Sequence, residues 1–320
     1  MMLVPQLLHF LAAGIPIILS GIGTGIGQGI ASVSALQAMT RQKEGTTAIF
    51  RTMILGLALI ETGAILSLVI TLMTLFGGQF DITTSIGIAE LGLGLAIGIA
   101  SLSVSIASSF TVKAACQSIA RQPLFATKIS TIMLFSQSII EAPVIFAFVI
   151  ALLIKTHITQ ALTMLEGVKL FSAGLAIGLG SIGPSIGQAI FTQSSCLAVG
   201  LNKKVFGKIF TFSLLSQAVV ETPVIFCMLV SIALIFKPIL LTTPLAYMVM
   251  FIAPALTVSL GSLGTSIATG YAASKSSRFI ALKPEHYPML LRTSLLGQAI
   301  IESSAIYALI IALTLMTKKL

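Results

Sequence analysis

Charged residues are scarce in this chain of 320 residues. Asp, Glu, Lys and Arg together make up 8% of it, whereas soluble domains carry about 25%. Tryptophan is absent, and three cysteines are too few for a disulfide framework. No Ser-His-Asp set and no cluster with metal-ligand spacing is apparent in the sequence. We therefore expect no catalytic site, no cofactor, and no bound metal apart from an ion such as sodium.

Long apolar runs take the place of the missing charge. The chain is 56% hydrophobic and its mean hydropathy is +1.08, and a helix needs about 20 apolar residues to cross a bilayer. Apolar runs that meet this length fall at 8–38, 48–76, 85–119, 126–154, 168–199, 206–236, 245–273 and 290–316. The sequence therefore predicts an all-α membrane protein with eight transmembrane helices.

The basic residues predict how the chain is oriented in the membrane. Thirteen of the 18 lysines and arginines lie in or beside the connections that join each odd-numbered segment to the next. By the positive-inside rule these connections are cytoplasmic, which suits a bacterial inner (plasma) membrane. Their charge favours contact with anionic lipid or an acidic partner. Because no aromatic residues are interleaved with it, we expect no nucleic-acid binding.

The chain repeats one unit four times. "SQSIIEAPVIF" and "SQAVVETPVIF" lie 80 residues apart and share seven of eleven positions. The same frame, with spacings of 80, 80 and 81, aligns Glu61, Glu141, Glu221 and Glu302. The predicted units are 1–80, 81–160, 161–241 and 242–320. Each contains two of the predicted helices, so the expected fold is four helical hairpins in tandem.

The stretch "GIGTGIGQG" at residues 21–29 superficially resembles a phosphate-binding loop. Its copies in the other units keep small residues but replace several glycines by serine or alanine. A phosphate loop needs its glycines and a following Lys-Ser or Lys-Thr pair, and the sequence offers neither in any copy. Small residues along a membrane helix instead allow neighbouring backbones to approach closely. We therefore expect the first helices of the hairpins to pack tightly together.

The repeated glutamates predict the chemistry. An ionisable side chain in the middle of a bilayer costs about 3 to 10 kcal/mol, so four of them at one repeated position indicate a function. An apolar environment favours the protonated carboxyl, whereas a nearby cation favours release of the proton. These residues are therefore predicted ion-binding carboxylates. The alternative is a buried carboxyl that only links helices.

Three segments carry a family resemblance. The inner helix "GLAIGLGSIGPSIGQ", the loop "ARQP" at 120–123 and the helix "SLLSQAVVETPVIF" resemble the c subunit, or proteolipid, of F-type rotary ATP synthases. The resemblance spans essentially the whole chain. Members of this family are usually single hairpins, so this chain looks like four of them fused. Vacuolar-type proteolipids are an alternative that fits less well, because every hairpin here keeps its glutamate.

The resemblance implies a rotor function. A ring of such hairpins turns in the membrane as each glutamate is loaded and unloaded beside an arginine of the a subunit, and the ring drives the central stalk during ATP synthesis or hydrolysis. Catalysis would then belong to the complex and not to this chain. Fusion implies a ring whose hairpins number a multiple of four, and we expect three chains. A small-solute transporter and a non-rotating scaffold are rival interpretations, disfavoured by four near-identical sites with little else polar around them.

The resemblance also assigns roles to other residues. In sodium-binding members a glutamine on the first helix and a hydroxyl after the glutamate help to hold the ion. The corresponding candidates are Gln28 and Thr62, Gln188 and Thr222, Ser108, and Thr269 with Ser303. The second unit, with Ser108 and Ala142, lacks the full set, so protons are favoured over sodium. The family's Arg-Gln/Asn-Pro turn, which faces the stalk, is intact at Arg121, Gln122 and Pro123 and partial at Arg41 and Gln42.

Several neighbouring residues carry weaker expectations. Pro143 and Pro223 follow their glutamates by two residues and predict helix kinks there. Glutamines one turn before three of the glutamates, Gln137, Gln217 and Gln298, are candidates to orient the carboxylates. The histidines His9, His157 and His286 lie near segment ends and share no repeat register, so we expect them at the membrane interface.

Overall fold

The chain folds almost entirely into helices. The structure is a computed structural model that describes residues 3–77, 81–239 and 245–317. The helices are α1 (Leu3–Arg41), α2 (Thr46–Ile60), α3 (Thr62–Phe76), α4 (Thr84–Arg121), α5 (Ala126–Ile140), α6 (Ala142–His157), α7 (Met164–Gly180), α8 (Ile182–Leu201), α9 (Phe206–Phe236), α10 (Val249–Leu282) and α11 (Tyr287–Thr317). Short 3₁₀ turns lie at η1 (Pro123–Phe125), η2 (Lys203–Val205), η3 (Leu245–Met248) and η4 (Pro284–His286).

These helices form eight membrane-crossing segments within the described part of the chain. The pairs α2–α3, α5–α6 and α7–α8 are consecutive halves of single segments, interrupted for one residue each. A helix satisfies its own backbone N–H and C=O groups, which lipid cannot do, so these apolar sequences are helical throughout. The predicted all-α membrane fold with eight spanning helices is therefore confirmed, and the chain is an integral membrane protein.

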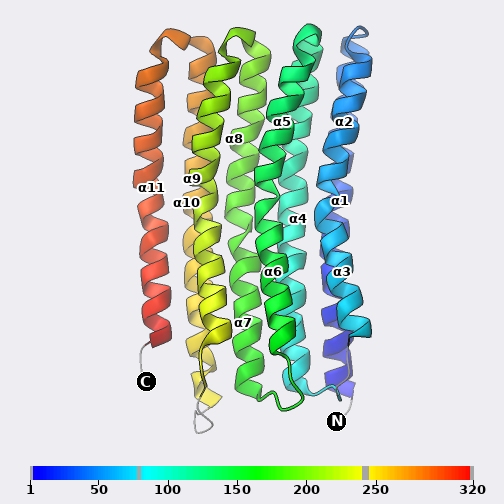
Figure 1. Cartoon of the computed structure of the whole chain (residues 1–320), viewed down its shortest axis with the longest axis vertical. Coiled ribbons are helices and arrows are strands. Elements are labelled where there is room, and N and C mark those ends of the chain that lie inside the picture. Colours follow the sequence, from blue (N-terminus) through cyan, green and yellow to red (C-terminus); the bar gives the residue numbers. More distant parts are fainter. Residues whose placement is uncertain (1–2, 78–80, 240–244, 318–320) are drawn as a thin grey trace.

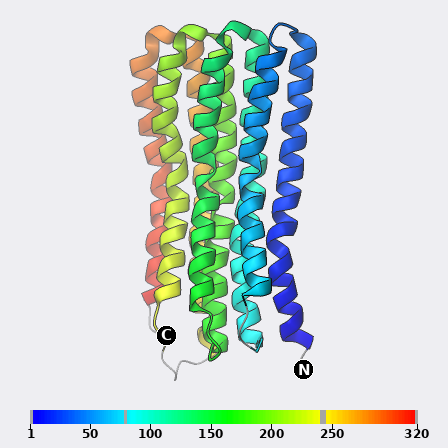
Figure 2. The ribbon, with the colours of Figure 1, turned by 45° about the vertical axis from the view of Figure 1, so that its right-hand side comes forward.

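The segments pair into four hairpins that lie side by side in chain order (Figure 1). Hairpin 1 is α1–α3, hairpin 2 is α4–α6, hairpin 3 is α7–α9 and hairpin 4 is α10–α11. The tight turns inside the hairpins gather at one end of the bundle, and both chain ends lie toward the other (Figures 1 and 2). We call the end with the tight turns the basic end, because most of the lysines and arginines lie there.

Two helix starts at the opposite end, those of α4 and α7, carry side-chain caps. The Thr83 hydroxyl accepts a hydrogen bond from the N–H of Ile86 at the start of α4. Thr163 and Glu166 form a capping box at the start of α7, in which each side chain accepts from the other residue's backbone N–H. Such caps satisfy N–H groups that a helix leaves free at its first turn.

The first helices of the hairpins form a closely packed inner layer, and the second helices cover them. A Cβ atom added to Gly174 on α7 would collide with the carbonyl of Gly92 on α4, and one on Gly270 would collide with that of Gly187. Only glycine allows backbones to approach this closely. The predicted tight packing of the small residues is confirmed at these junctions.

The glycines of the 21–29 stretch divide between two faces of α1. Gly23 and Gly27 pack against the backbones of Leu102 and Ser105 on α4. On the other face, an added Cβ would meet no atom within 4 Å at Gly21, Gly25 or Gly29. One half of this glycine row therefore builds the junction with hairpin 2, and the other half lies at the open edge of the bundle.

Two second helices change geometry at their glutamates. The regular helix is interrupted at Glu61 and Glu141, where the backbone carbonyl accepts from the N–H three residues later, at 3.0 and 3.1 Å. Pro143, which has no N–H, follows the second interruption by two residues, and the helix kinks predicted at Pro143 and Pro223 stay predictions. Hairpin 1 is interrupted without a proline, whereas α9 is assigned as one helix through Pro223. The interruptions therefore do not follow the prolines.

Candidate functional site

The four repeated glutamates lie at equivalent positions on the second helices. Glu61 joins α2 to α3, Glu141 joins α5 to α6, and Glu221 and Glu302 lie within α9 and α11. Their exposure differs: Glu141 is buried at 5%, Glu221 and Glu302 are half-buried, and Glu61 is exposed. One repeated sequence position thus has three different surroundings within a single chain.

Contacts between hairpins explain the exposure of Glu61. One turn before the glutamates, the Gln217 and Gln298 amides donate to serine hydroxyls of the preceding hairpin, at 3.4 and 3.1 Å. Gln137 likewise donates to the carbonyl of Gly56 on α2, at 3.3 Å. The second helices of hairpins 2, 3 and 4 therefore each contact the preceding hairpin. Hairpin 1 has no preceding hairpin in this chain, so its glutamate lies at an uncovered edge.

These amide hydrogen bonds show one contact of each of the three glutamines. The sequence made Gln137, Gln217 and Gln298 candidates to orient the carboxylates, and that role stays a prediction. In the structure their amide nitrogens donate to the preceding hairpin, and the Gln298 amide also donates to Ser294 of its own helix. These contacts link the second helix of one hairpin to the hairpin before it.

Glu141 has the most enclosed site. The Ser108 hydroxyl on α4 donates to Glu141 Oε1 over 3.0 Å. The other carboxyl oxygen, Oε2, is buried and has no hydrogen-bond partner among the described residues. A buried carboxylate oxygen without a donor is costly, and a proton or a cation bound there would satisfy it. The site can therefore hold a small positive ion between the first and second helices of hairpin 2.

The predicted glutamine ligands lie between the helices of their hairpins. Gln188 on α8 is buried, and its amide donates to the backbone carbonyl of Gln217 over 3.0 Å, one turn before Glu221. Its side-chain oxygen Oε1 is buried without a partner among the described residues. Gln28, at the equivalent position on α1, is half-buried. Of the two glutamines, Gln188 is therefore the one that is buried between α8 and α9, about one turn from Glu221.

The predicted hydroxyl ligands mostly bond to their own helices. Thr222, Thr269 and Ser303 each donate to a carbonyl three or four residues earlier, at 2.7 to 3.0 Å. The Thr222 hydroxyl also faces the Glu302 carboxyl of the next hairpin. Thr62 is half-buried. The structure thus places Ser108 and Thr222 beside a repeated carboxyl, but does not gather a full ligand set at any one of the four.

The predicted stalk-facing residues lie in the turns at the basic end: Arg41, Gln42, Arg121, Gln122 and Pro123. The Gln122 amide donates to the carbonyl of Gly200 in hairpin 3, over 2.8 Å. Asn202, its counterpart in hairpin 3, donates to the carbonyl of Ala281 over 3.1 Å. The amide of this turn therefore holds adjacent hairpins together, while both arginines remain exposed.

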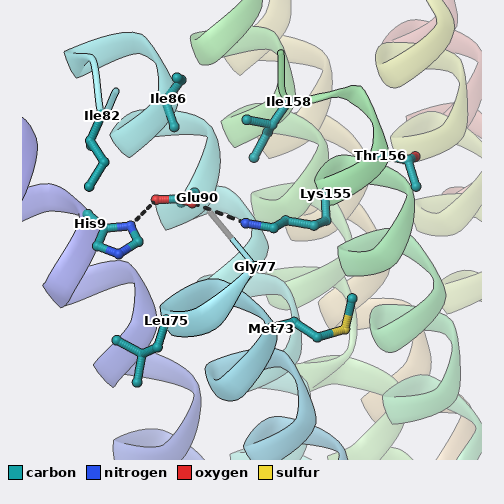
Figure 3. A pocket seen from close by; sticks show the side chains of 10 residues that line it. All are labelled: His9, Met73, Leu75, Gly77, Ile82, Ile86, Glu90, Lys155, Thr156 and Ile158. Atoms are coloured by element: carbon teal, nitrogen blue, oxygen red, sulfur yellow. Dashed lines mark hydrogen bonds and ion pairs between the residues drawn. The ribbon is translucent and has the colours of Figure 1, made fainter. Parts of the chain in front are cut away.

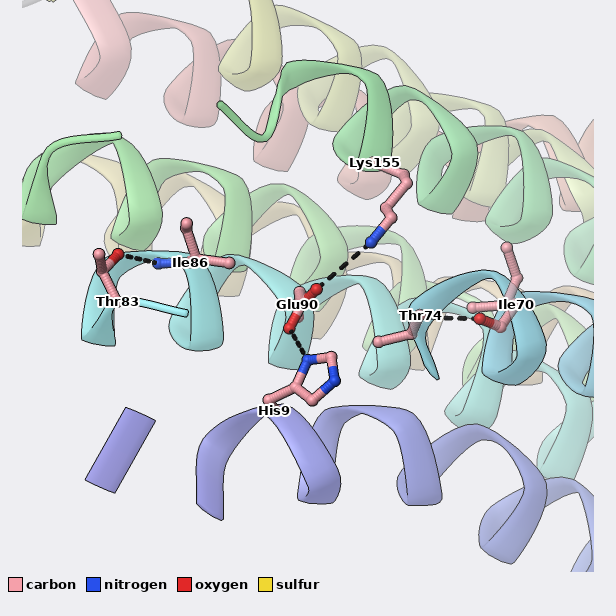
Figure 4. A network of polar contacts seen from close by, with 7 residues as sticks. All are labelled: His9, Ile70, Thr74, Thr83, Ile86, Glu90 and Lys155. Carbon is pink, nitrogen blue, oxygen red and sulfur yellow. Dashed lines mark hydrogen bonds and ion pairs between the residues drawn. The ribbon is translucent and has the colours of Figure 1, made fainter. Parts of the chain in front are cut away.

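A second buried carboxylate, which the sequence did not predict as a site, lies near the opposite end. Glu90 on α4 is 3% exposed and faces two basic side chains. Its Oε2 lies 2.6 Å from His9 Nδ1 on α1, and its Oε1 lies 3.3 Å from Lys155 Nζ on α6. Figures 3 and 4 show Glu90 between these two side chains. The three residues, which we call the Glu90 cluster, join two hairpins at a pocket of about 430 Å³.

The Glu90 cluster adds a partner to His9. This histidine is only 7% exposed and is paired with Glu90, while its predicted place at the membrane interface stays a prediction. The cluster has no repeat register, because the counterparts of Glu90 are Phe10, Leu170 and Phe251. The sequence signal that could have found it is an acidic residue at a position where the other repeats are apolar.

Comparison with known proteins gives one family. The family model described as the ATP synthase C subunit matches residues 11–74, 91–154, 171–234 and 252–315, once in each hairpin. The ATP synthase c subunit of Dehalococcoides mccartyi (strain CBDB1) is 46% identical over 69 residues, 22% of this chain and 91% of that protein. That of Geotalea uraniireducens is 46% identical over 70 residues, 22% of this chain and 77% of the relative. That of Alkaliphilus oremlandii is 50% identical over 66 residues, 21% and 74% of the two chains.

Proposed function

Because this chain belongs to the family of ATP synthase c subunits, we propose that its rotor proteolipid role is carried out by proton binding at the four repeated glutamates. Each hairpin contributes one carrier, so Glu61, Glu141, Glu221 and Glu302 share the task. The proposed units are 1–80, 81–160, 161–241 and 242–320. The partners are further copies of this chain, the a subunit and the central stalk, with the turns at the basic end facing the stalk.

The geometry of Glu141 is the observation that best supports this proposal. Its carboxyl is buried, accepts one hydrogen bond from Ser108, and has a second oxygen without a partner among the described residues. In the protonated form the carboxyl carries no net charge and can face lipid at low cost. Beside a cation of a stationary subunit the anion becomes favourable and the proton leaves. Alternation between these two states moves one proton per hairpin as the ring turns.

The same site favours protons over sodium. A proton requires only the carboxyl oxygen, whereas sodium needs several oxygen ligands to replace its hydration shell. Ser108 supplies one hydroxyl to the Glu141 site, and Ala142 supplies none. Since a ring must load every site with the same ion, the site with the fewest ligands determines which ion the whole ring can carry. Sodium remains the alternative cargo, supported by Gln188 and Thr222 in hairpin 3.

Ring closure by further copies is supported by the two free edges of the bundle. At the junction between hairpins 3 and 4, Gly183 on α8 packs against the backbone of Leu263. Gly264, its counterpart on α10, has open space around it. Hairpin 1 of a second copy, with its own row of uncovered glycines, fits that edge and would have its exposed Glu61 covered by hairpin 4.

We propose a ring of three chains with twelve glutamates. Closed rings place the same type of contact at every junction, and both internal and terminal junctions here use small residues. The hairpin count is then a multiple of four. The basic turns are proposed to be cytoplasmic, in a bacterial inner membrane.

Labelling with dicyclohexylcarbodiimide, read out by peptide mass, tests the carriers. This reagent modifies protonated carboxyls, so we expect all four glutamates to react, faster at acid pH. Glu90, held between two basic groups, and Glu44, exposed in a turn, serve as controls that should react little. Labelling of only one or two of the four would overturn the four-carrier proposal. Strong protection of Glu141 by millimolar sodium would reverse the choice of ion.

A further inference from the structure

The basic end of the bundle holds a cationic pocket. It has a volume of about 520 Å³ and lies between α8 and α10, and Arg121 from the end of α4 is one of its lining residues. Lys275 and Arg278 of α10 also line it. All lining residues belong to first helices of one chain, so the pocket forms without a second copy. We call it the α8–α10 pocket.

Two of the three cations of this pocket, Lys275 and Arg278, depart from the repeat, whereas Arg121 has a basic counterpart in Arg41. The counterparts of Lys275 in the other hairpins are Ser34, Ala114 and Ser194. Those of Arg278 are Gln37, Gln117 and Leu197. The pocket therefore occurs once per chain, whereas any property of the rotor hairpin itself occurs four times.

The three cations have no carboxylate partner within the described residues, which include all nine acidic residues of the chain. Among the described residues, the carboxylates that form ion pairs are those of Glu90 and Glu285, and neither lines this pocket. Lys275 Nζ lies 5.0 Å from the centre of the Tyr271 ring, an attraction that leaves its charge unneutralised. Three unpaired cations around one pocket attract an anion.

The remaining lining of the pocket is partly polar and partly apolar. Gln193 supplies an amide, and Ser194, whose hydroxyl donates to the carbonyl of Ser274 over 2.7 Å, can still accept a hydrogen bond. Ile190 lines the pocket on the side toward the middle of the bundle. One turn further along α8, Ile186 continues this apolar surface and is 40% exposed. A suitable ligand is thus anionic at one end and apolar at the other.

We propose that the α8–α10 pocket binds the phosphate headgroup of an anionic phospholipid, one molecule per chain. Arginine presents a planar fork of N–H donors that matches phosphate oxygens. Basic pockets between membrane helices recognise such headgroups. The apolar surface at Ile190 and Ile186 then lies against the acyl chains. A free phosphate shares the headgroup chemistry but makes no use of this surface.

Native mass spectrometry of the delipidated, detergent-solubilised assembly tests the proposal. The probes are phosphatidylglycerol, phosphatidylcholine and inorganic phosphate. We expect one tightly retained phosphatidylglycerol per chain, and neither of the other probes. The double variant Lys275→Gln/Arg278→Gln should weaken retention about 30-fold, the loss expected for two cations acting on a phosphate at a membrane surface. The control Lys43→Gln/Arg51→Gln removes one lysine and one arginine from hairpin 1 at the same end and should retain the lipid.

A second variant tests the pocket with a smaller risk of misfolding. Gln193→Glu is nearly isosteric, keeps all three cations and adds a negative charge to the pocket, so it should also lose the lipid. Equal loss in the hairpin 1 control, or retention of several lipids per chain, would show unspecific attraction to the basic end. Binding of inorganic phosphate as tight as that of the lipid would identify a free-phosphate site. Retention unchanged in both pocket variants would overturn the proposal.

Discussion

Two carboxylates of hairpin 2, Glu90 and Glu141, are both buried but have opposite surroundings. Each oxygen of Glu90 faces a basic group, His9 at 2.6 Å and Lys155 at 3.3 Å. Glu141 has no basic neighbour within ion-pair distance among the described residues, and accepts one hydrogen bond from Ser108 while its Oε2 stays unpartnered. The two carboxylates are thus equally hidden from solvent and differ in what the protein itself supplies to them.

This difference separates a structural carboxylate from a proposed carrier. Both oxygens of Glu90 are already engaged by the protein, and its charge is balanced in place, so nothing remains for an ion to complete. Glu141 offers an unpartnered oxygen, and its position recurs in all four hairpins, whereas that of Glu90 does not. Burial alone therefore does not identify an ion site. The partners of the carboxyl and its recurrence in the repeat do.

The largest expected effect comes from removing the charge of Glu141. Glu141→Gln should lower ATP-driven proton pumping to background, because an amide cannot take up and release a proton and every fourth step of the ring fails. Glu90→Gln should leave pumping measurable. Quenching of a pH-sensitive dye in vesicles, at equal amounts of assembled complex, checks both. Pumping at the wild-type rate by Glu141→Gln would show that Glu141 is not a carrier and does not differ from Glu90 in this respect.

The next largest effect concerns the Glu90 cluster. Glu90→Ala leaves Lys155 without its partner in a poorly solvated place, which should destabilise the protein by about 3 kcal/mol. The free energy of unfolding, measured by titration with a denaturing detergent, gives this value. The control Glu44→Gln changes an exposed carboxyl in the turn of hairpin 1 and should have no measurable effect. If Glu90→Ala unfolds like the wild type, the cluster does not hold hairpins 1 and 2 together.

The fold could be predicted because its determinants are periodic in the sequence. Apolar runs long enough to span a membrane specify the eight segments, and the 80-residue repeat specifies the hairpins. The alignment of Glu61, Glu141, Glu221 and Glu302 follows from the same register. Such signals need no knowledge of three-dimensional packing.

The partners of the carboxyls could not be predicted in the same way. The Glu90 cluster joins α1, α4 and α6 at positions that share no register, so no periodicity points to it. Sequence alignment makes Ser108 and Thr269 equivalent, yet Ser108 donates to a glutamate and Thr269 to its own helix. Side-chain rotation and the packing of each hairpin decide between these partners, and both depend on the neighbouring hairpins.

This difference between Ser108 and Thr269 gives a smaller expected effect. Ser108→Ala removes the hydroxyl donor of Glu141 and should lower the rate of proton pumping about fivefold, the factor that corresponds to one hydrogen bond of about 1 kcal/mol. Thr269→Ala, at the equivalent position of hairpin 4, should leave the rate unchanged because its hydroxyl donates to a backbone carbonyl. Equal losses in the two variants would mean that both hydroxyls take part in ion binding.

The smallest expected effect distinguishes a link between hairpins from an ion ligand. Gln137 donates to the carbonyl of Gly56 over 3.3 Å, and its counterpart in hairpin 1 is already a leucine, Leu57. Gln137→Leu should therefore cost about 0.5 kcal/mol of unfolding free energy, the lower range for a single hydrogen bond. Because the amide contacts the neighbouring hairpin, carbodiimide labelling of Glu141 should proceed at the wild-type rate. A severalfold change in that rate, with stability preserved, would instead make Gln137 a group that orients the carboxylate.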